Sequence, residues 1–380
     1  MKKLLGIISI LALVIMLPLS ASAAGAAKGS PAPAPAPAPA PAVQAASSDQ
    51  TPEPSNVKVG VGDLQISGIF QAVGKFLHKK NDNTDTFDMK RARIFLIGSI
   101  IPDKIKYVFQ GDAAQIVKLT TDASGNDAAV PWLLDARIIF VNALPSTDIQ
   151  VGRFLPNFTY YMPQLVSKLD FIEYPLLTSK FGMFRQVGLQ STTKFSGGSF
   201  NVGLTNSSGL EDDPEAPHYM NTWTDSDNWK SLLLRGNINP SDNVQTAVYL
   251  VTSREKSSAG GVVGDGPYWT VMKAGGFLKV SQSGLNAILE GLFANEGRYR
   301  GYSVYAQAGY KPSDKVEALV RFEVYDPKIM NSCQLRPTIG LNYYISGTNA
   351  AIYLDWFMDK YMASGSNATQ TVEAQAQVAF

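Results

Sequence analysis

The sequence contains very little cysteine and histidine. Cys333 is the single cysteine among 380 residues, so an internal disulfide and cysteine motifs for zinc or haem are excluded. His78 and His218 are the only histidines, and both lie in sequence typical of loops. A hydrolase would need a histidine beside a serine or carboxylates. An enzyme therefore remains the weaker alternative, and we expect no catalytic residues, no cofactor and no metal.

Charged residues are also scarce. Asp, Glu, Lys and Arg make up 17% of the chain, whereas about 25% is usual for soluble domains. Removal of Lys2 and Lys3 with a leader would leave 33 − 2 = 31 basic residues against 32 acidic ones, a net charge of −1. A chain without a basic bias is a poor partner for nucleic acid, so we expect none.

Long apolar runs are absent except at the N-terminus. There, Met1-Lys2-Lys3 precedes "LLGIISILALVIML", and Ala21-Ser22-Ala23 has the small-residue form of a cleavage site. This pattern predicts a signal peptide over residues 1–23. The alternative is an uncleaved anchor, although the run is shorter than the about 20 residues that a helical span needs. No later stretch is long enough for a transmembrane helix.

Residues 24–57 differ in composition from the remainder. They contain "SPAPAPAPAPAPA" and flanks rich in Ala, Ser, Gln and Pro, which cannot bury a core and favour an extended polyproline conformation. We expect a disordered periplasmic linker here. It is either a spacer that reaches the cell wall or a partner, or a leader with no specific role.

What the body of the chain does contain is alternation with a period of two. In the last ten residues, "TVEAQAQVAF", Val372, Ala374 and Val378 alternate with Glu373 and Gln375. Side chains alternate between the two faces of a strand, so this pattern predicts strands with one apolar face. The same pattern recurs near Leu64–Ala72, Tyr302–Tyr310 and Val316–Val324.

Turn signals set the number of strands. Seven short segments rich in Gly, Pro, Asn, Asp and Ser begin at Pro102, Pro145, Ser196, Asn239, Ser281, Lys311 and Ser346. They alternate with eight longer connections, and 15 connections join 16 strands. The expected fold class is therefore all-β: a 16-stranded antiparallel transmembrane β-barrel over residues 58–380, with short periplasmic turns and long external loops.

Two soluble folds are the alternatives to the barrel. A β-helix needs a repeat of fixed length, which is absent, and a sandwich needs a close-packed inner face, whereas the apolar faces here mix Ala and Gly with large residues. In a barrel the last strand pairs with the first, near Leu64, because backbone groups in hydrocarbon need partners. Phe380 is then expected at the periplasmic aromatic girdle, with a role in assembly.

The charged residues on the faces opposite the apolar ones are the candidate pore lining. Towards lipid, Arg or Lys would cost about 2–4 kcal/mol at mid-membrane, so these side chains are expected to point inward. They either select ions or only keep the interior hydrated. The candidates are Arg91, Arg93, Asp112, Asp135, Arg137, Arg153, Arg235 and Arg321.

The longest connection, Leu155 to Met183, is too apolar for a water-exposed loop, and a segment of this length usually has a function. We expect it to fold into the barrel as a constriction loop, burying Tyr160, Tyr161, Leu165, Phe171 and Leu176, with one or two helical turns over 164–172. Residues expected at the narrowed passage are Tyr160, Tyr161, Lys168, Asp170, Glu173 and Lys180. The alternative is an external lid or a trimer contact.

Several segments resemble the phosphate-selective porin O and P family: "FDMKRARIFLIGSIIPDKIKYVFQGDAA", "DARIIFVNALPSTDIQVGRFLPNF", "LDFIEYPLL", "RQVGLQ" and "NVGLTNSSG". The resemblance covers Leu64 to Phe380. It implies a trimeric outer-membrane porin with inwardly folded loops. Phosphate-specific members of the family use an arginine ladder, and Arg91, Arg93 and Arg153 lie in the matching segments.

The sequence therefore leads us to expect an outer-membrane porin of a Gram-negative bacterium. It would form a passive, water-filled diffusion channel for small hydrophilic solutes, with a mild preference for anions and with phosphate as one candidate. Expected partners are outer-membrane lipid, small anions or other hydrophilic solutes, the barrel assembly machinery and two further copies in a homotrimer. The alternative is a structural barrel that anchors the periplasmic spacer or scaffolds a partner complex.

Overall fold

The computed structural model describes residues 57–59, 62–79, 82–114, 119–121, 127–129, 132–182, 185–206, 229–256, 268–296, 299–328, 333–362 and 367–380. The expected signal peptide and all but the last residue of the expected linker lie outside the described residues.

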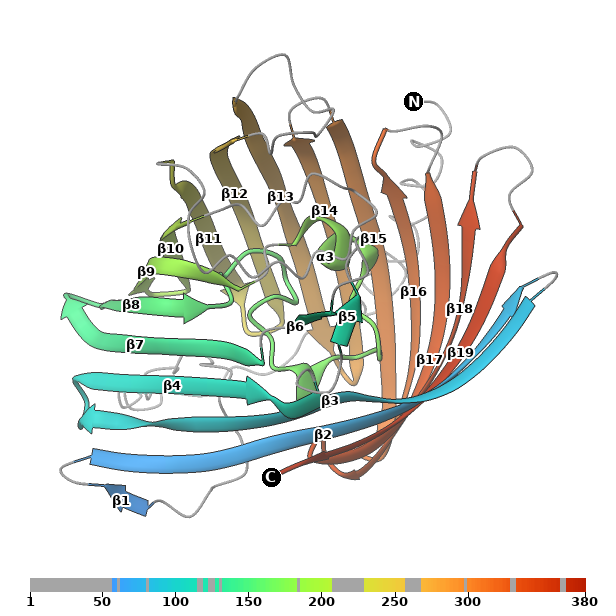
Figure 1. Ribbon diagram of the computed structural model, residues 1–380, viewed down its shortest axis with the longest axis horizontal. Helices are drawn as coiled ribbons and strands as arrows, with labels where there is room; N and C mark the ends of the chain where they lie inside the picture. Colours follow the sequence, from blue (N-terminus) through green and yellow to red (C-terminus); the bar gives the residue numbers. More distant parts are fainter. Residues whose placement is uncertain are drawn as a thin grey trace, which may run out of the picture. The chain divides into compact units, whose positions relative to one another are not determined.

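Sixteen long antiparallel strands form one closed ring (Figure 1). In ring order they are β2 (Gly62–Lys79), β3 (Asp82–Ile101), β4 (Ile105–Asp112), β7 (Leu133–Leu144), β8 (Thr147–Phe154), β9 (Gln186–Phe195), β10 (Gly198–Thr205), β11 (Ser231–Ser241), β12 (Val244–Lys256), β13 (Tyr268–Gln282), β14 (Leu285–Glu296), β15 (Tyr299–Ser313), β16 (Val316–Asp326), β17 (Gln334–Ser346), β18 (Ala350–Tyr361) and β19 (Thr369–Ala379). β1 (Val57–Val59) pairs with the start of β2, and β5 (Leu119–Thr121) pairs with β6 (Asp127–Ala129). The expected barrel and its strand number are confirmed.

The ring closes where the last strand, β19, pairs with the first long strand, β2. β19 pairs with β2 from Gln370 opposite His78 to Ala379 opposite Ile69. Phe380 extends this ladder: its N–H donates to the Gly68 carbonyl at 3.0 Å, and its carbonyl accepts from the Gly68 N–H at 2.8 Å. The Phe380 ring stacks on Phe70 with centroids 5.9 Å apart. The Phe380 side chain is thus fixed on the outer face of the seam between β19 and β2.

The seven predicted turns all join consecutive strands at one end of the barrel. The other end has the remaining connections, of which 113–132, 155–185 and 206–230 are the longest. Two of the eight connections at that end are short, because β2 and β3 flank only residues 80–81 and β14 and β15 flank only 297–298. His78 is part of β2 and exposed, whereas its sequence context suggested a loop. His218 lies outside the described residues.

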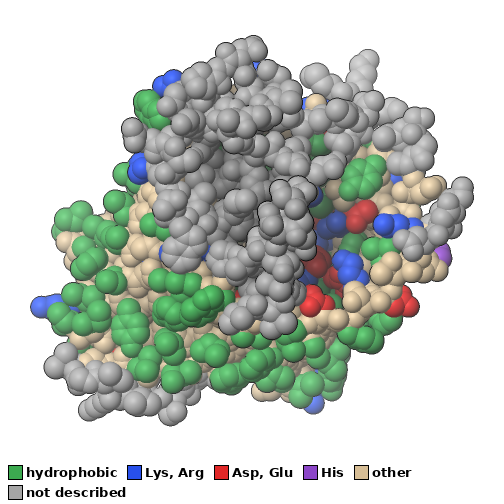
Figure 2. All heavy atoms as spheres, viewed as in Figure 1, with side chains coloured by type: hydrophobic (Ala, Val, Ile, Leu, Met, Phe, Trp, Pro, Cys, Tyr) green, Lys and Arg blue, Asp and Glu red, His purple; other side chains and the backbone are tan. Residues whose placement is uncertain are grey.

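The two faces of the strands follow the predicted alternation. On β19, Val372 and Val378 are exposed while Glu373, Gln375 and Gln377 are buried in the interior. Figure 2 shows hydrophobic side chains covering the outer face of the β2, β3, β4 and β7 side, with acidic and basic side chains gathered in an opening beside it. The apolar surface is therefore on the outside of the barrel and the charged surface on the inside. Among the described residues, no helix is long and apolar enough to cross a membrane.

Candidate functional site

The segment between β8 and β9 lies inside the barrel. Its described part, residues 155–182, contains a 3-10 turn, Val166–Lys168, and the helix α3, Leu176–Phe181. The 3-10 turn lies within the predicted helical stretch, whereas α3 was not predicted. Tyr160, Tyr161, Phe171 and Leu176 are buried as expected, and Leu165 is only partly buried. We call residues 155–182 the inner loop.

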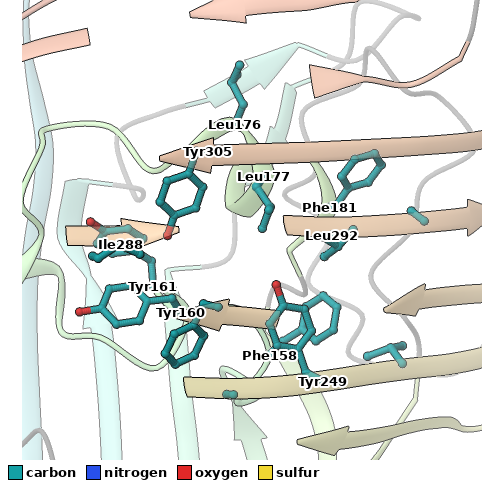
Figure 3. Close-up of a cluster of buried hydrophobic side chains, with 14 of the residues drawn as sticks. Phe158, Tyr160, Tyr161, Leu176, Leu177, Phe181, Tyr249, Ile288, Leu292 and Tyr305 are labelled. Atoms are coloured by element: carbon teal, nitrogen blue, oxygen red, sulfur yellow. The ribbon is translucent and has the colours of Figure 1, made fainter. Parts of the chain in front are cut away.

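Apolar packing joins the inner loop to the strands of one side of the barrel (Figure 3). Phe158 lies edge-on to Tyr249 of β12 at 4.8 Å between centroids, and Tyr160 lies edge-on to Phe277 of β13 at 5.0 Å. Leu176, Leu177 and Phe181 of α3 contribute to the same cluster. A barrel interior that only contains water would not present such a surface. The aromatic and aliphatic residues of this wall therefore form the apolar surface against which the inner loop packs.

Three buried carboxylates of the same wall accept backbone N–H groups of the inner loop. Glu290 of β14 accepts from Tyr160 N at 2.7 Å, Asp355 of β18 from Ile172 N at 2.7 Å, and Glu323 of β16 from Leu176 N at 2.5 Å. Glu290 also accepts the hydroxyls of Tyr249 and Tyr305, each at 2.8 Å. A non-helical loop has backbone donors with no partner of its own. These carboxylates supply the missing partners.

Long polar side chains of the wall bind the carbonyls of the inner loop. Arg235 donates to the Phe158 and Thr159 carbonyls at 3.2 and 2.9 Å. Arg321 donates to the Glu173 carbonyl at 3.2 Å. Further donors are Asn342 to the Asp170 carbonyl and Gln377 to the Ser167 carbonyl. Arg235 and Arg321, predicted as pore lining, are thus buried against the inner loop.

On β3 a bulge changes which side chains face inward. Gln71 of β2 pairs with Arg91 and Ala72 pairs with Met89, so Lys90 has no partner on β2. Such a bulge puts two residues of one strand opposite one of its neighbour. Lys90 bonds to Glu173 of the inner loop, and Arg91 donates to Gln71 Oε1 at 2.6 Å. Lys90 and Arg91 therefore both face the interior.

Three residues predicted as pore lining, Arg93, Asp112 and Arg137, point towards the interior of the barrel. Arg93 Nε lies 3.0 Å from Asp112 Oδ2, where β4 ends, and Asp112 also accepts the N–H of Ala92 at 3.0 Å. Arg137 of β7 donates to Gln150 of β8 at 3.1 Å. Two of these three groups thus form an ion pair within the wall, and Asp112 is fully buried.

Arg153 and Asp135 lie near a cation that the sequence did not single out. Gly152 has a backbone φ of 127°, which residues with a side chain rarely adopt. A Cβ atom at this position would lie 2.3 Å from the Ala136 carbonyl oxygen. Arg153 follows it and bonds through Nε to the Leu133 and Leu134 carbonyls at 3.3 and 3.1 Å. Asp135 is paired with Arg185 at 2.7 Å. Arg185 therefore lies close to two of the predicted pore-lining residues, Asp135 and Arg153.

The predicted residues of the inner loop divide between its packed face and its open edge. Asp170 accepts from the Tyr161 hydroxyl at 2.7 Å and from Gln307 at 2.5 Å. Lys180 lies over the Tyr325 ring at 5.9 Å, and Lys168 is partly exposed. Burial works to raise the pKa of Glu173, but the charge and hydrogen bond of Lys90, with Arg91 and Lys75, outweigh it and lower that pKa.

Exposure differs between the acidic and basic groups of the interior. The carboxylates of Asp112, Glu290 and Glu323 are 0% exposed. By contrast, the side chains of Lys75 and Lys90 are 38% and 15% exposed. The side chains of Arg93, Arg185 and Arg336 are 12%, 13% and 15% exposed. Among the partly exposed acids of the interior, Glu173 and Asp359 are paired with Lys90 and Arg336, whereas Asp170 accepts from Tyr161 and Gln307. The accessible interior is therefore richer in basic than in acidic groups.

Sequence reasoning missed Lys75, Lys90 and Arg185. Lys75 follows the alternation of β2, so the pattern itself could have found it. Lys90 depends on the bulge and Arg185 lies outside the strands, and no local signal indicates either position. Among the residues that the structure describes, no group of acidic, histidine and cysteine side chains is arranged to hold a metal ion.

The barrel is similar to solved outer-membrane channels. The outer membrane channel DcaP of Acinetobacter baumannii superimposes with a TM-score of 0.60 at 13% identity, over 86% of this chain and 99% of that one. The anion-selective porin from Comamonas acidovorans gives 0.58 at 14%, over 84% and 100%. OmpT of Vibrio cholerae in its trimer form gives 0.54 at 11%, over 84% and 100%. At these identities the likeness establishes the fold.

No protein-family model matches the sequence, and neither does any curated protein.

Proposed function

We propose that the protein is an outer-membrane porin, a passive water-filled channel for small hydrophilic solutes with a mild preference for anions. The observation that carries the preference is the unequal exposure of interior charge. Asp112, Glu290 and Glu323 are fully buried, while Lys75 and Lys90 remain accessible. In a narrow passage with walls of low dielectric constant, such a local excess focuses the field and raises the local concentration of anions.

The membrane location follows from the outer surface. A closed antiparallel barrel leaves no unpaired strand edge in hydrocarbon, and its exposed outer positions include Ile66, Val248 and Val320. We propose that these contact outer-membrane lipid of a Gram-negative bacterium after export by a signal peptide (1–23), with 24–57 as a periplasmic linker. The fold of the Vibrio cholerae OmpT trimer form supports a homotrimer, and insertion would use the barrel assembly machinery. The protein would have no enzymatic activity.

Phosphate is the first anion to test. Phosphate is suggested by the resemblance of the β3 and β8 segments to the phosphate-selective porins. The porin of Comamonas acidovorans is described as anion-selective. Arg91 and Arg93 on β3 carry the proposal here, together with Lys90 and Arg185 near them. Competition by phosphate against chloride current distinguishes a phosphate channel from a general anion channel.

A structural barrel is the second candidate, and one observation favours it. The inner loop packs into a large apolar cluster inside the barrel, as a plug would. A barrel that is filled in this way can serve as an anchor without conducting. Single-channel recording separates the two functions, because a plugged anchor gives no current.

The test of anion preference uses reversal potentials in asymmetric salt. Lys90→Gln with Arg91→Gln removes two interior cations whose partners are a half-exposed Glu173 and the neutral Gln71, so neither change leaves a fully buried charge alone. We expect the reversal potential to shift towards cation preference. Lys360→Gln, on the outer face of β18 and exposed, is the matched control and should leave it unchanged.

Salt provides the second arm of the same experiment. Screening shortens to about 3 Å at 1 M salt, so the wild-type preference should weaken there. If the double variant keeps the wild-type reversal potential, the proposed preference is wrong, although the channel itself would stand.

A further inference from the structure

Residues of the barrel wall hold the inner loop in place, and what we infer from these contacts rests on the proposed channel function. The inner loop contains few internal hydrogen bonds, because only the turn Val166–Lys168 and the short helix α3 are regular. Its polar backbone must be satisfied by the barrel. The positions of the hydrogen bonds between the loop backbone and the wall show how firmly the loop is fixed.

The contacts are spread along the whole loop and across the wall. From the start of the inner loop to α3, the acceptors are Glu290 for Tyr160 N, Asp355 for Ile172 N and Glu323 for Leu176 N. These acceptors come from β14, β18 and β16, and all are at most 1% exposed. Between them, Arg235, Arg321 and Asn342 bind loop carbonyls. The loop is therefore attached at both ends and in the middle.

Burial makes these attachments important. A donor and an acceptor that lie away from water each need a hydrogen-bond partner, and the acceptor oxygen supplies it with or without a charge. A carboxylate is costly to bury, and its burial is compensated only while such donors are present. The loop and the wall therefore depend on each other. If the inner loop moved away from the wall, Glu290, Glu323 and Asp355 would lose their N–H donors.

We infer that Glu290 and Asp355 are positioning residues that determine the bore of the channel by holding the inner loop against the β11–β19 wall. The loop is then a fixed wedge, and the solute path runs beside it, along the side that carries Lys90, Arg91 and Arg93. Neither carboxylate contacts the solute. Each acts through the backbone of the inner loop.

The experiment compares loss of the acceptor with loss of the charge. Glu290→Met with Asp355→Leu removes both acceptors, whereas Glu290→Gln with Asp355→Asn keeps an acceptor oxygen at each position and removes only the charge. Glu317→Met is the matched control, because Glu317 is a buried wall carboxylate that accepts from the Tyr344 hydroxyl at 2.6 Å and binds no loop N–H. All variants are first checked for a folded, heat-modifiable barrel.

The readout is the size of neutral polyethylene glycol that enters the channel and reduces its single-channel conductance. For the Met/Leu variant we expect a larger exclusion size and about a twofold higher conductance, since conduction depends on the radius of the narrowest part. The Gln/Asn and Glu317→Met variants should keep the wild-type exclusion size. An unchanged exclusion size in the folded Met/Leu variant would show that apolar packing alone holds the loop.

A measurement on the wild-type protein keeps the inference testable if the Met/Leu barrel does not fold. Hydrogen exchange should be as slow at the amides of Tyr160, Ile172 and Leu176 as in the neighbouring strands, because opening breaks their hydrogen bonds to buried carboxylates and the packing around them. Fast exchange at these three amides would overturn the inference. Failure of the proposed function is distinct, since a protein without any conductance would fail before these comparisons begin.

Discussion

At the scale of single residues, Arg91 and Arg93 lie on the same face of β3 but differ in the partners that they bind. Arg91 bonds to the neutral Gln71, whereas Arg93 is the ion-pair partner of the fully buried Asp112. Both were predicted as pore lining from the same alternation. The sequence shows that they share a face, but their partners come from other strands, so only the structure separates a cation with a neutral partner from one that neutralises a buried acid.

Arg93→Gln should destabilise the barrel by about 3 kcal/mol, because breaking a buried pair leaves an uncompensated charge. Arg91→Gln is the control and should change stability little. Urea unfolding in lipid bilayers, followed by tryptophan fluorescence, measures both. Adding Asp112→Asn to Arg93→Gln should recover part of the loss, and failure to recover it would mean that Arg93 acts through packing instead.

Ala374→Arg should impair assembly, because Ala374 faces outward near the middle of β19, where it lines a groove with Ala72 and Gly74. Arginine facing lipid at mid-membrane costs about 2–4 kcal/mol. The inward neighbour Glu373 is paired with Lys75, and Glu373→Gln keeps its shape and should assemble. Heat-modifiable gel mobility compares them; greater damage from the Glu373 change would contradict the register.

The pH response of Glu173 provides a further test at this scale. Lys90 keeps the pKa of Glu173 below its ordinary value of 4.5. The stabilising ion pair is thus fully present above pH 4.5 and is lost as pH falls through the lower, folded-state pKa. Protonation also removes an anion from the passage, so the anion preference should rise in that acidic range. Glu173→Gln should abolish the change in reversal potential, and its persistence would assign it to another group.

At the scale of elements, the bulge on β3 explains why part of the interior could not be predicted. Alternation assumes a regular strand, and it correctly placed Arg91, Arg93 and the whole of β19. At Lys90 the strand contains one residue more than its neighbour, and no local sequence feature marks the position. The contacts of the inner loop are equally inaccessible to local reasoning, since Tyr160 and Glu290 are 130 residues apart.

Deletion of Lys90 should therefore be tolerated, because it removes the one β3 residue that has no partner on β2 and leaves the ladder on either side in register. Deletion of Leu96 is the matched control. Leu96 pairs with Ile66 on one side and Phe109 on the other, so its loss would turn the outer face of half the strand inward. The yield of folded barrel in outer-membrane fractions measures both, and equal yields would contradict the assigned bulge.

At the scale of the whole molecule, the sequence predicted the architecture better than the interior. Turn signals and alternation led to the strand number, the faces and the β19–β2 closure, because a barrel in hydrocarbon must pair every strand. The depth to which the inner loop fills the barrel was only partly predictable. Its apolar residues indicated burial, but whether the loop plugs the barrel or narrows it depends on wall contacts such as those of Glu290 and Asp355.

The most direct test of a conducting barrel with a basic interior is single-channel recording of the purified wild-type protein in a planar bilayer under a salt gradient. We predict discrete current steps with a reversal potential on the anion side. This preference should approach zero as salt screens the charges of Lys75 and Lys90. The absence of current steps from folded protein, or a reversal potential on the cation side at low salt, would contradict the account.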